Sequence, residues 1–156
     1  TKNNITPQDF IFLISLMIID ETDNSEYFLY KFNISNEDKK RIRFLQNVFS
    51  KPLDRKTFSE KNLWKMLYYN NKNYLNDLIN FQIYRSKKID KKLIKLKEFF
   101  SNQLPPKFNV KAKFLMEKFN LKEGKELGQK IKEIEIAWID NSFTITDKQI
   151  EKIING

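Results

Sequence analysis

Two residue types are entirely missing from this chain of 156 residues, which contains neither cysteine nor histidine. Without cysteine the chain has no disulfide, no thiolate metal site and no thiol nucleophile. Without histidine it also lacks the side chain that most often serves as a general base near neutral pH. A catalytic site built from this chain alone would have to use carboxylates, lysine, serine, threonine or tyrosine.

Membrane-spanning segments and familiar catalytic patterns are also missing. The apolar run FIFLISLMII (residues 10–19) is shorter than the ~20 residues that cross a bilayer, so it predicts a buried helix. There is no charged-then-apolar secretory leader, and the lack of cysteine fits a reducing compartment, so we expect a cytoplasmic protein. No GxxxxGK[ST], GxSxG or HExxH pattern occurs. Glu133 and Glu135, two apart on a predicted helix, point to nearly opposite sides, so we predict no catalytic or metal-binding residues.

The composition is that of a folded protein, since 40% of the residues are hydrophobic and 14% are aromatic. The length allows one domain or two small ones. Because the chain begins with Thr1 rather than methionine, we expect it to be a piece of a longer protein. On that view, any chemistry of the longer protein lies in the part that is missing.

The net charge of +9 is distributed unevenly. Lys and Arg outnumber Asp and Glu by 12 to 10 in residues 1–84 and by 15 to 5 in residues 85–132, whereas acidic residues lead by 5 to 2 in residues 133–156. A biased genome composition would enrich lysine, but it would spread the lysines evenly. A localised basic stretch instead indicates a polyanionic partner.

Apolar residues recur at helical spacing along nearly the whole chain, and no alternation long enough for a sheet is present. We therefore predict an all-α protein, an irregular bundle of about seven to nine helices. A helical body would cover residues 1–104 and a small tail subdomain residues 105–156, because Pro105 and Pro106 stop the preceding helix. The first helix is expected to bury one face, formed by Phe10, Leu13, Ile14, Met17 and Ile18. The last long helix is expected to bury Leu127, Ile131, Ile134 and Trp138.

Four helix starts are marked by capping residues. Ser35 with Asp38, and Thr146 with Gln149, have the spacing of a capping box. Ser59 is a candidate N-cap, and Thr6 followed by Pro7 is a further start signal.

Two features of the basic stretch each allow two interpretations. Gly124 and Gly128, two of only three glycines, either let a sugar-phosphate backbone approach a helix N-terminus, or mark a helix stop with Gly128 small for close packing. The segment 84–97, YRSKKIDKKLIKLK, is either a helix that tracks phosphates or a solvated face whose inward side is Leu93 and Leu96.

The C-terminal third resembles the tail of bacterial CCA-adding enzymes and their poly(A) polymerase relatives. The stretch PPKFNVKAKFLMEKFNLKEGKELGQKIKEIEIAWIDNSFTIT is similar to the pattern P-x-F-x-[IV]-x-G-x-D-L, a short helix, P-G-x-x-[IL]-G and a helix ending near Trp-Ile. The residues that match are Pro106, Phe108, Val110, Leu115, Gly124, Leu127, Gly128, Glu135, Trp138 and Ile139, and Phe143 with the helix capped by Thr146 matches the end. Ala112 and Phe114 replace the Gly and Asp of the first turn, and Glu123 replaces the Pro that precedes the second. The glycines of the second turn, Gly124 and Gly128, are present. Residues 32–42 and 62–86 are similar more loosely.

This resemblance implies a division of labour between the chain and a missing catalytic head. The head would hold Mg²⁺ and CTP or ATP and would add nucleotides to the tRNA 3′ end. This chain would bind the sugar-phosphate backbone of the acceptor and T-arm half of tRNA. It would have no cofactor and no catalytic activity of its own. The candidate RNA-binding residues are Arg85, Lys87, Lys88, Lys111, Lys113, Lys122, Gly124, Lys125, Gly128, Lys130 and Lys132. The alternatives are a stand-alone nucleic-acid-binding module and a helical scaffold that binds proteins.

Overall fold

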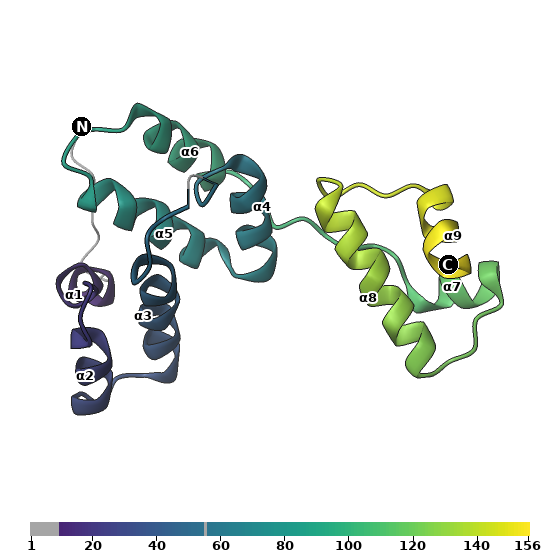
Figure 1. Cartoon of the computed structure of the whole chain (residues 1–156), viewed down its shortest axis with the longest axis horizontal. Coiled ribbons are helices and arrows are strands. Elements are labelled where there is room, and N and C mark those ends of the chain that lie inside the picture. Colours follow the sequence, from purple (N-terminus) through teal and green to yellow (C-terminus); the bar gives the residue numbers. More distant parts are fainter. Residues whose placement is uncertain (1–9, 55) are drawn as a thin grey trace. The chain divides into compact units, whose positions relative to one another are not determined.

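The computed structural model describes residues 10–54 and 56–156, and every regular element among them is an α-helix (Figure 1). The all-α expectation is therefore confirmed, and the nine helices seen in the described residues fall within the predicted number. None of these helices has the length and apolar character needed to cross a membrane. In chain order they are α1 (Phe10–Ile18), α2 (Asn24–Lys31), α3 (Asn36–Phe49), α4 (Glu60–Tyr69), α5 (Lys72–Arg85), α6 (Lys91–Ser101), α7 (Ala112–Phe119), α8 (Lys125–Asp140) and α9 (Asp147–Asn155).

The chain divides into two compact units between Pro105 and Pro106. Unit 1 contains α1 to α6, and unit 2 runs from Pro106 to Gly156 and contains α7 to α9. The residues around the division, 103–111, form no helix. Proline explains the break locally, because it donates no amide hydrogen bond and holds the preceding residue in an extended conformation.

Helix α5 is the centre of unit 1. It packs against α1, α3, α4 and α6 (Figure 1). Leu75, Leu78, Ile79 and Phe81 are fully buried on it. The Phe81 ring lies 4.4 Å, centroid to centroid, from the ring of Phe49 at the end of α3. Helix α5 therefore forms the core of unit 1 together with these four neighbours.

The predicted helix starts at Ser35, Ser59 and Thr146 are confirmed. Ser35 Oγ accepts from the Asp38 amide at 3.1 Å, and Ser59 Oγ accepts from the Asn62 amide at 3.4 Å. Thr146 forms a complete capping box with Gln149. Each cap satisfies an amide that the helix leaves unpaired, which contributes ~1 kcal/mol to stability. The predicted start at Thr6-Pro7 lies outside the described residues.

The predicted buried face of α1 is wrong for three of its five residues. Phe10, Leu13 and Met17 are 66%, 42% and 80% exposed, whereas Phe12 and Ser15 are buried instead. The other two predicted residues, Ile14 and Ile18, are half-buried, and Ile18 packs against the core. The helix is apolar on nearly every side, so the spacing of its apolar residues could not identify the inward face. Ser15, the only polar residue, turns inward because its hydroxyl donates to the Ile11 carbonyl at 2.7 Å. That internal hydrogen bond removes the usual cost of burying a hydroxyl.

The core of unit 2 forms where α7, α8 and α9 meet. Leu115, Leu127, Ile134 and Ile150 are buried together, so the predicted inward face of α8 is confirmed. Trp138 closes one end of this core, 5.3 Å from the Phe108 ring and 5.0 Å from the Phe143 ring.

Candidate nucleic-acid interface

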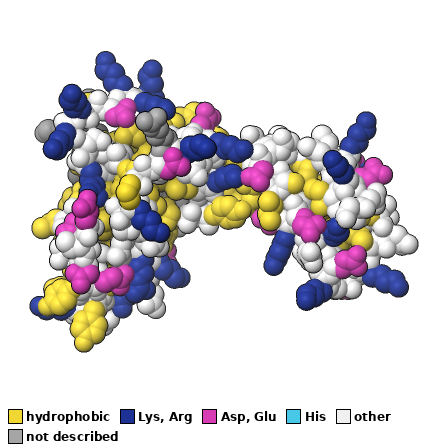
Figure 2. All heavy atoms as spheres, viewed as in Figure 1, with side chains coloured by type: hydrophobic (Ala, Val, Ile, Leu, Met, Phe, Trp, Pro, Cys, Tyr) yellow, Lys and Arg dark blue, Asp and Glu magenta, His cyan; other side chains and the backbone are white. Residues whose placement is uncertain are grey.

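The densest positive charge lies where α5 ends and α6 begins. Seven cationic residues and a single acidic one, Asp90, fall within residues 85–97. We call the seven the basic edge; its members are Arg85, Lys87, Lys88, Lys91, Lys92, Lys95 and Lys97. Six of them are exposed and Lys97 is half-buried. Figure 2 shows Lys and Arg side chains gathered over this part of unit 1.

The lysines of the basic edge are not neutralised by neighbouring carboxylates. Within the described part of the chain, none of the seven cations forms an ion pair. Lys91 and Lys92 also stand in the first turn of α6, which contains no acidic residue. A helix N-terminus carries a partial positive charge, so each cation there is unfavourable by about 0.3–1 kcal/mol. The edge therefore keeps a positive potential that only an external anion can offset.

The N-cap of α6 limits how an anion can bind there. Asp90 Oδ1 accepts from the Lys92 amide at 2.8 Å and from the Leu93 amide at 3.3 Å. Two of the amides at this helix start are therefore already satisfied. An anion on the basic edge would be bound by lysine and arginine side chains rather than by the helix backbone.

Arg85 is fixed at the end of α5 by aromatic rings. Its guanidinium carbon lies 5.6 Å from the Phe81 ring centroid and 6.0 Å from that of Phe49. Cation–π contacts of this kind orient the side chain without neutralising its charge. Arg85 thus presents a positioned cation, while Lys87 and Lys88 extend from the exposed link between the two helices.

The glycine turn of unit 2 is open to solvent. Gly124 is the N-cap residue of α8, with φ 149° and ψ −165°, and Gly128 lies one turn into the helix. A Cβ added at either position would meet no heavy atom within 4 Å. The interpretation that Gly128 is small for close packing is therefore wrong. The open backbone fits the other interpretation, although Lys122 and Lys125 are balanced here by the equally exposed Glu123 and Glu126.

The two glycines are expected to respond to alanine with opposite signs. Gly124→Ala should lower the free energy of unfolding by about 1–2 kcal/mol, because few side-chain-bearing residues adopt its backbone conformation. Gly128→Ala should raise it by up to about 1 kcal/mol, since Gly128 is helical and has free space around it. Urea denaturation followed by circular dichroism measures both. A loss of stability in both variants would contradict this account of the turn.

The other unit 2 candidates divide into exposed and engaged lysines. Lys113 is exposed, and its Nζ lies 3.7 Å from Glu117 Oε1. Lys130 is half-buried, and its Nζ donates to the Ile153 carbonyl of α9 at 2.6 Å and lies 3.5 Å from Glu133. Lys130 thus ties α8 to α9. The remaining lysines of the set are exposed and form no ion pair in the part of the chain that the structure describes; they are Lys111, Lys122, Lys125 and Lys132.

Replacing Lys130 should therefore affect stability rather than RNA binding. Lys130→Met keeps the apolar stem but removes the donor to the Ile153 carbonyl, and we expect a loss of about 1 kcal/mol. Thermal unfolding gives the stability, and fluorescence anisotropy with labelled tRNA gives the affinity. Lys148→Met, an exposed lysine of α9 outside the candidate RNA-binding set, is the matched control. If Lys130→Met has wild-type stability but lower affinity for RNA, Lys130 contributes to RNA binding and this prediction is wrong.

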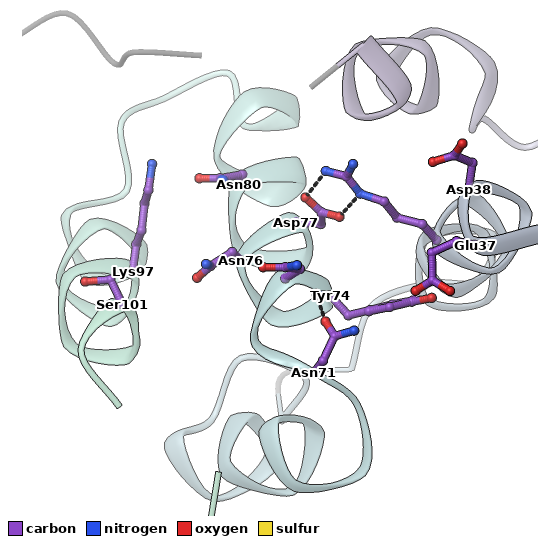
Figure 3. A pocket seen from close by; sticks show the side chains of 11 residues that line it. Glu37, Asp38, Asn71, Tyr74, Asn76, Asp77, Asn80, Lys97 and Ser101 are labelled. Atoms are coloured by element: carbon purple, nitrogen blue, oxygen red, sulfur yellow. Dashed lines mark hydrogen bonds and ion pairs between the residues drawn. The ribbon is translucent and has the colours of Figure 1, made fainter. Parts of the chain in front are cut away.

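Sequence reasoning missed a polar groove in unit 1 (Figure 3). Its volume is about 420 Å³, its floor is α5, and its walls come from α3 and α6. On the floor, Asn73, Asn76, Asp77 and Asn80 recur at spacings of three, one and three residues, which places them on one face of the helix. This stripe of polar residues, on a helix whose other residues form the core, was the feature of the sequence that could have predicted the groove. The remaining lining residues are Glu37, Asp38, Arg41, Asn71, Tyr74, Lys97 and Ser101.

A buried ion pair forms one side of this groove. Asp77 is only 6% exposed, and its Oδ1 accepts from Arg41 Nη2 at 2.7 Å while its Oδ2 accepts from Arg41 Nε. Burial raises the pKa of the neighbouring Tyr74 hydroxyl above its usual value, and the nearby Glu37 carboxylate raises it further. Tyr74 therefore stays neutral and keeps its proton as a donor.

On the other side of the groove, Asn80 Oδ1 is buried without a hydrogen-bond partner. Figure 3 shows Asn76 and Asn80 projecting toward α6, on the side of Lys97 and Ser101. In the described residues, the groove included, no three acidic side chains are grouped so that they could hold a metal ion.

The candidate residues from the sequence fall into both units. Arg85, Lys87 and Lys88 belong to unit 1, and the other eight belong to unit 2. Comparisons of the chain with protein-family models, with curated proteins and with solved structures found no match. The resemblance to CCA-adding enzymes consequently stays a prediction based on sequence pattern.

Proposed function

We propose that this protein binds RNA through the phosphate backbone, with the basic edge as its principal contact. The observation that carries the proposal is the set of seven cations in residues 85–97 that no described acidic side chain neutralises. Two of them stand where the helix dipole disfavours cations, so the arrangement opposes stability of the free protein. Helix α6 has 11 residues and a length of ~16 Å, enough to follow several phosphates.

The RNA partner we propose is tRNA, held by its acceptor and T-arm half. Double-stranded RNA is bound mainly through its shape, phosphates and 2′-hydroxyls, so a backbone-directed surface would accept any tRNA sequence. The resemblance of the C-terminal third supports this choice. On the same basis, the chain would be the non-catalytic part of a cytoplasmic tRNA nucleotidyltransferase whose head carries the Mg²⁺ and nucleotide sites. The open glycine turn of unit 2 would add a second backbone contact.

Fluorescence anisotropy of labelled tRNA, titrated at several salt concentrations, tests the proposal. If about 4–6 phosphates are neutralised, the logarithm of the affinity should fall with the logarithm of salt concentration with a slope of roughly −4 to −5. An unlabelled DNA duplex of similar length should compete poorly. A slope near zero would refute backbone binding. Equal competition by DNA would leave a general polyanion-binding surface and remove tRNA from the proposal.

A second candidate function, protein binding, is favoured by an apolar surface on α1 and α2. Six large apolar residues are exposed there, Phe10, Leu13, Met17, Tyr27, Tyr30 and Phe32. Figure 2 shows apolar side chains exposed at the α2 end of unit 1. Exposed apolar clusters often mark sites of protein interaction. If charge reversal of the basic edge leaves RNA affinity unchanged, that result would favour protein binding over RNA binding.

A further inference from the structure

We propose that the polar groove of unit 1 binds one unstacked nucleotide of an RNA strand whose phosphates lie on the basic edge. This inference rests on the proposed function and names a second element of recognition, a nucleobase. The base would lie against Asn76 and Asn80, and the attached phosphate would lie on the α6 side near Lys97.

The size and lining of the groove suit a small polar group. A volume of about 420 Å³ lies within the range of ligand sites and exceeds what one water molecule occupies. Eight of the eleven lining residues have neutral or mutually paired polar side chains, Arg41, Asn71, Asn73, Tyr74, Asn76, Asp77, Asn80 and Ser101. Such a surface favours a ligand rich in hydrogen-bonding groups over an apolar one.

The unpartnered oxygen of Asn80 defines what the ligand must supply. More than nine in ten buried polar groups have a hydrogen-bond partner, so a buried acceptor without one calls for an explanation. A donor N–H entering the groove would satisfy it. Nucleobases carry such donors on their edges, either as an exocyclic amine or as a ring N–H. Asparagine amides pair well with base edges because they offer a donor and an acceptor side by side.

The neighbouring residues would hold that base edge in register. Asn76 and Asn80 are four residues apart, and both project toward α6 (Figure 3). Their amides therefore lie on successive turns of one helix face. The Arg41–Asp77 pair anchors α5 to α3 beside them, so the floor cannot move freely. Two amides held in fixed positions would bind a strand that carries a base more tightly than a strand that lacks one.

Lys97 links the groove to the basic edge. It lines the groove, lies on α6 and is half-buried, whereas Lys91, Lys92 and Lys95 are exposed on the same helix. A strand that follows α6 with its phosphates thus passes the groove mouth. Proteins that recognise single-stranded RNA commonly bind unstacked bases in this way, with phosphates on cations and bases in separate sites.

The test compares two labelled oligomers with the same number of phosphates. One is a single-stranded RNA of mixed sequence, and the other is an abasic phosphodiester strand. We expect wild-type protein to bind the RNA at least about 10-fold more tightly than the abasic strand. Asn80→Leu should reduce RNA affinity to the abasic level and leave abasic binding unchanged. Asn47→Leu, an exposed asparagine of α3 that does not line the groove, is the matched control.

The outcomes separate this inference from the proposed function. Equal, salt-sensitive binding of both oligomers by wild-type protein overturns the inference and leaves backbone binding intact. If the protein binds labelled tRNA but neither oligomer, the inference alone is overturned. If it binds neither the oligomers nor tRNA, both proposals are overturned. Retention of the RNA preference in Asn80→Leu also overturns the inference. If circular dichroism shows that Asn80→Leu does not fold, Asn76→Leu, at a half-buried position on the same face, gives the decisive comparison.

Discussion

Reversing three charges of the basic edge is expected to weaken tRNA binding on the order of 100-fold at about 50 mM salt. The variant is Lys91→Glu, Lys92→Glu and Lys95→Glu, three exposed positions of α6. Each lysine that neutralises a phosphate releases a condensed counterion, and this release is most favourable at low salt. The slope of log affinity against log salt should therefore become less negative by about 2–3. Anisotropy titrations at several salt concentrations give both quantities.

The same variant should fold at least as well as the wild-type protein. Lys91 and Lys92 occupy the first turn of α6, where glutamate interacts favourably with the helix dipole. A loss of RNA affinity could then not be attributed to unfolding. The control reverses Lys31, Lys51 and Lys56, which are exposed and lie outside the basic edge. If both variants lose affinity equally, net charge rather than the basic edge governs binding.

Removing the carboxylate of Asp77 is expected to lower the free energy of unfolding by about 3 kcal/mol. Asp77 is almost fully buried, and Arg41 donates two hydrogen bonds to it. In Asp77→Ala the guanidinium loses that partner while its side chain stays only 21% exposed. An incompletely compensated buried charge is the main source of the loss. Urea denaturation monitored by circular dichroism measures the effect.

A double variant distinguishes lost charge pairing from lost packing. Arg41→Met together with Asp77→Leu replaces both charges by apolar groups of similar size, and it should recover most of the stability lost in Asp77→Ala. Asn73→Ala, an exposed residue on the same helix, should change stability by no more than about 0.5 kcal/mol. A cost below about 1 kcal/mol for Asp77→Ala would mean that water replaces the carboxylate as the partner of Arg41.

The helices and their starts were predictable because their signals are local. Ser35, Ser59 and Thr146 each cap a helix through a hydrogen bond to a residue three positions ahead. The inward face of α8 was predictable as well, since charged residues alternate with its apolar ones. The face of α1 was not, because Phe10 and Phe12 are equally apolar and only tertiary packing chooses between them. Periodicity identifies a buried face only when a polar face opposes it.

The candidate site was predictable only where it depends on charge along the chain. The excess of lysine after residue 85 was visible in the sequence, and the structure leaves most of these side chains exposed, some in unit 1 and some in unit 2. The groove depends on residues such as Arg41 and Asp77, 36 positions apart, whose contact no local pattern indicates. Lys130 shows the converse limit. Its sequence neighbourhood matches that of an exposed lysine, yet its ammonium is engaged by the backbone of a helix more than twenty residues away.

The placement of the two tryptophans has a spectroscopic consequence. Trp64 packs against Phe99 and Phe100 in unit 1, and Trp138 packs against Phe108 and Phe143 in unit 2. Since the chain contains no other tryptophan, Trp64→Phe leaves tryptophan emission from unit 2 alone, and Trp138→Phe leaves tryptophan emission from unit 1 alone. Two single-tryptophan proteins thus record the melting of each unit separately. Without any added label, they would tell whether the units lose their structure together or one after the other.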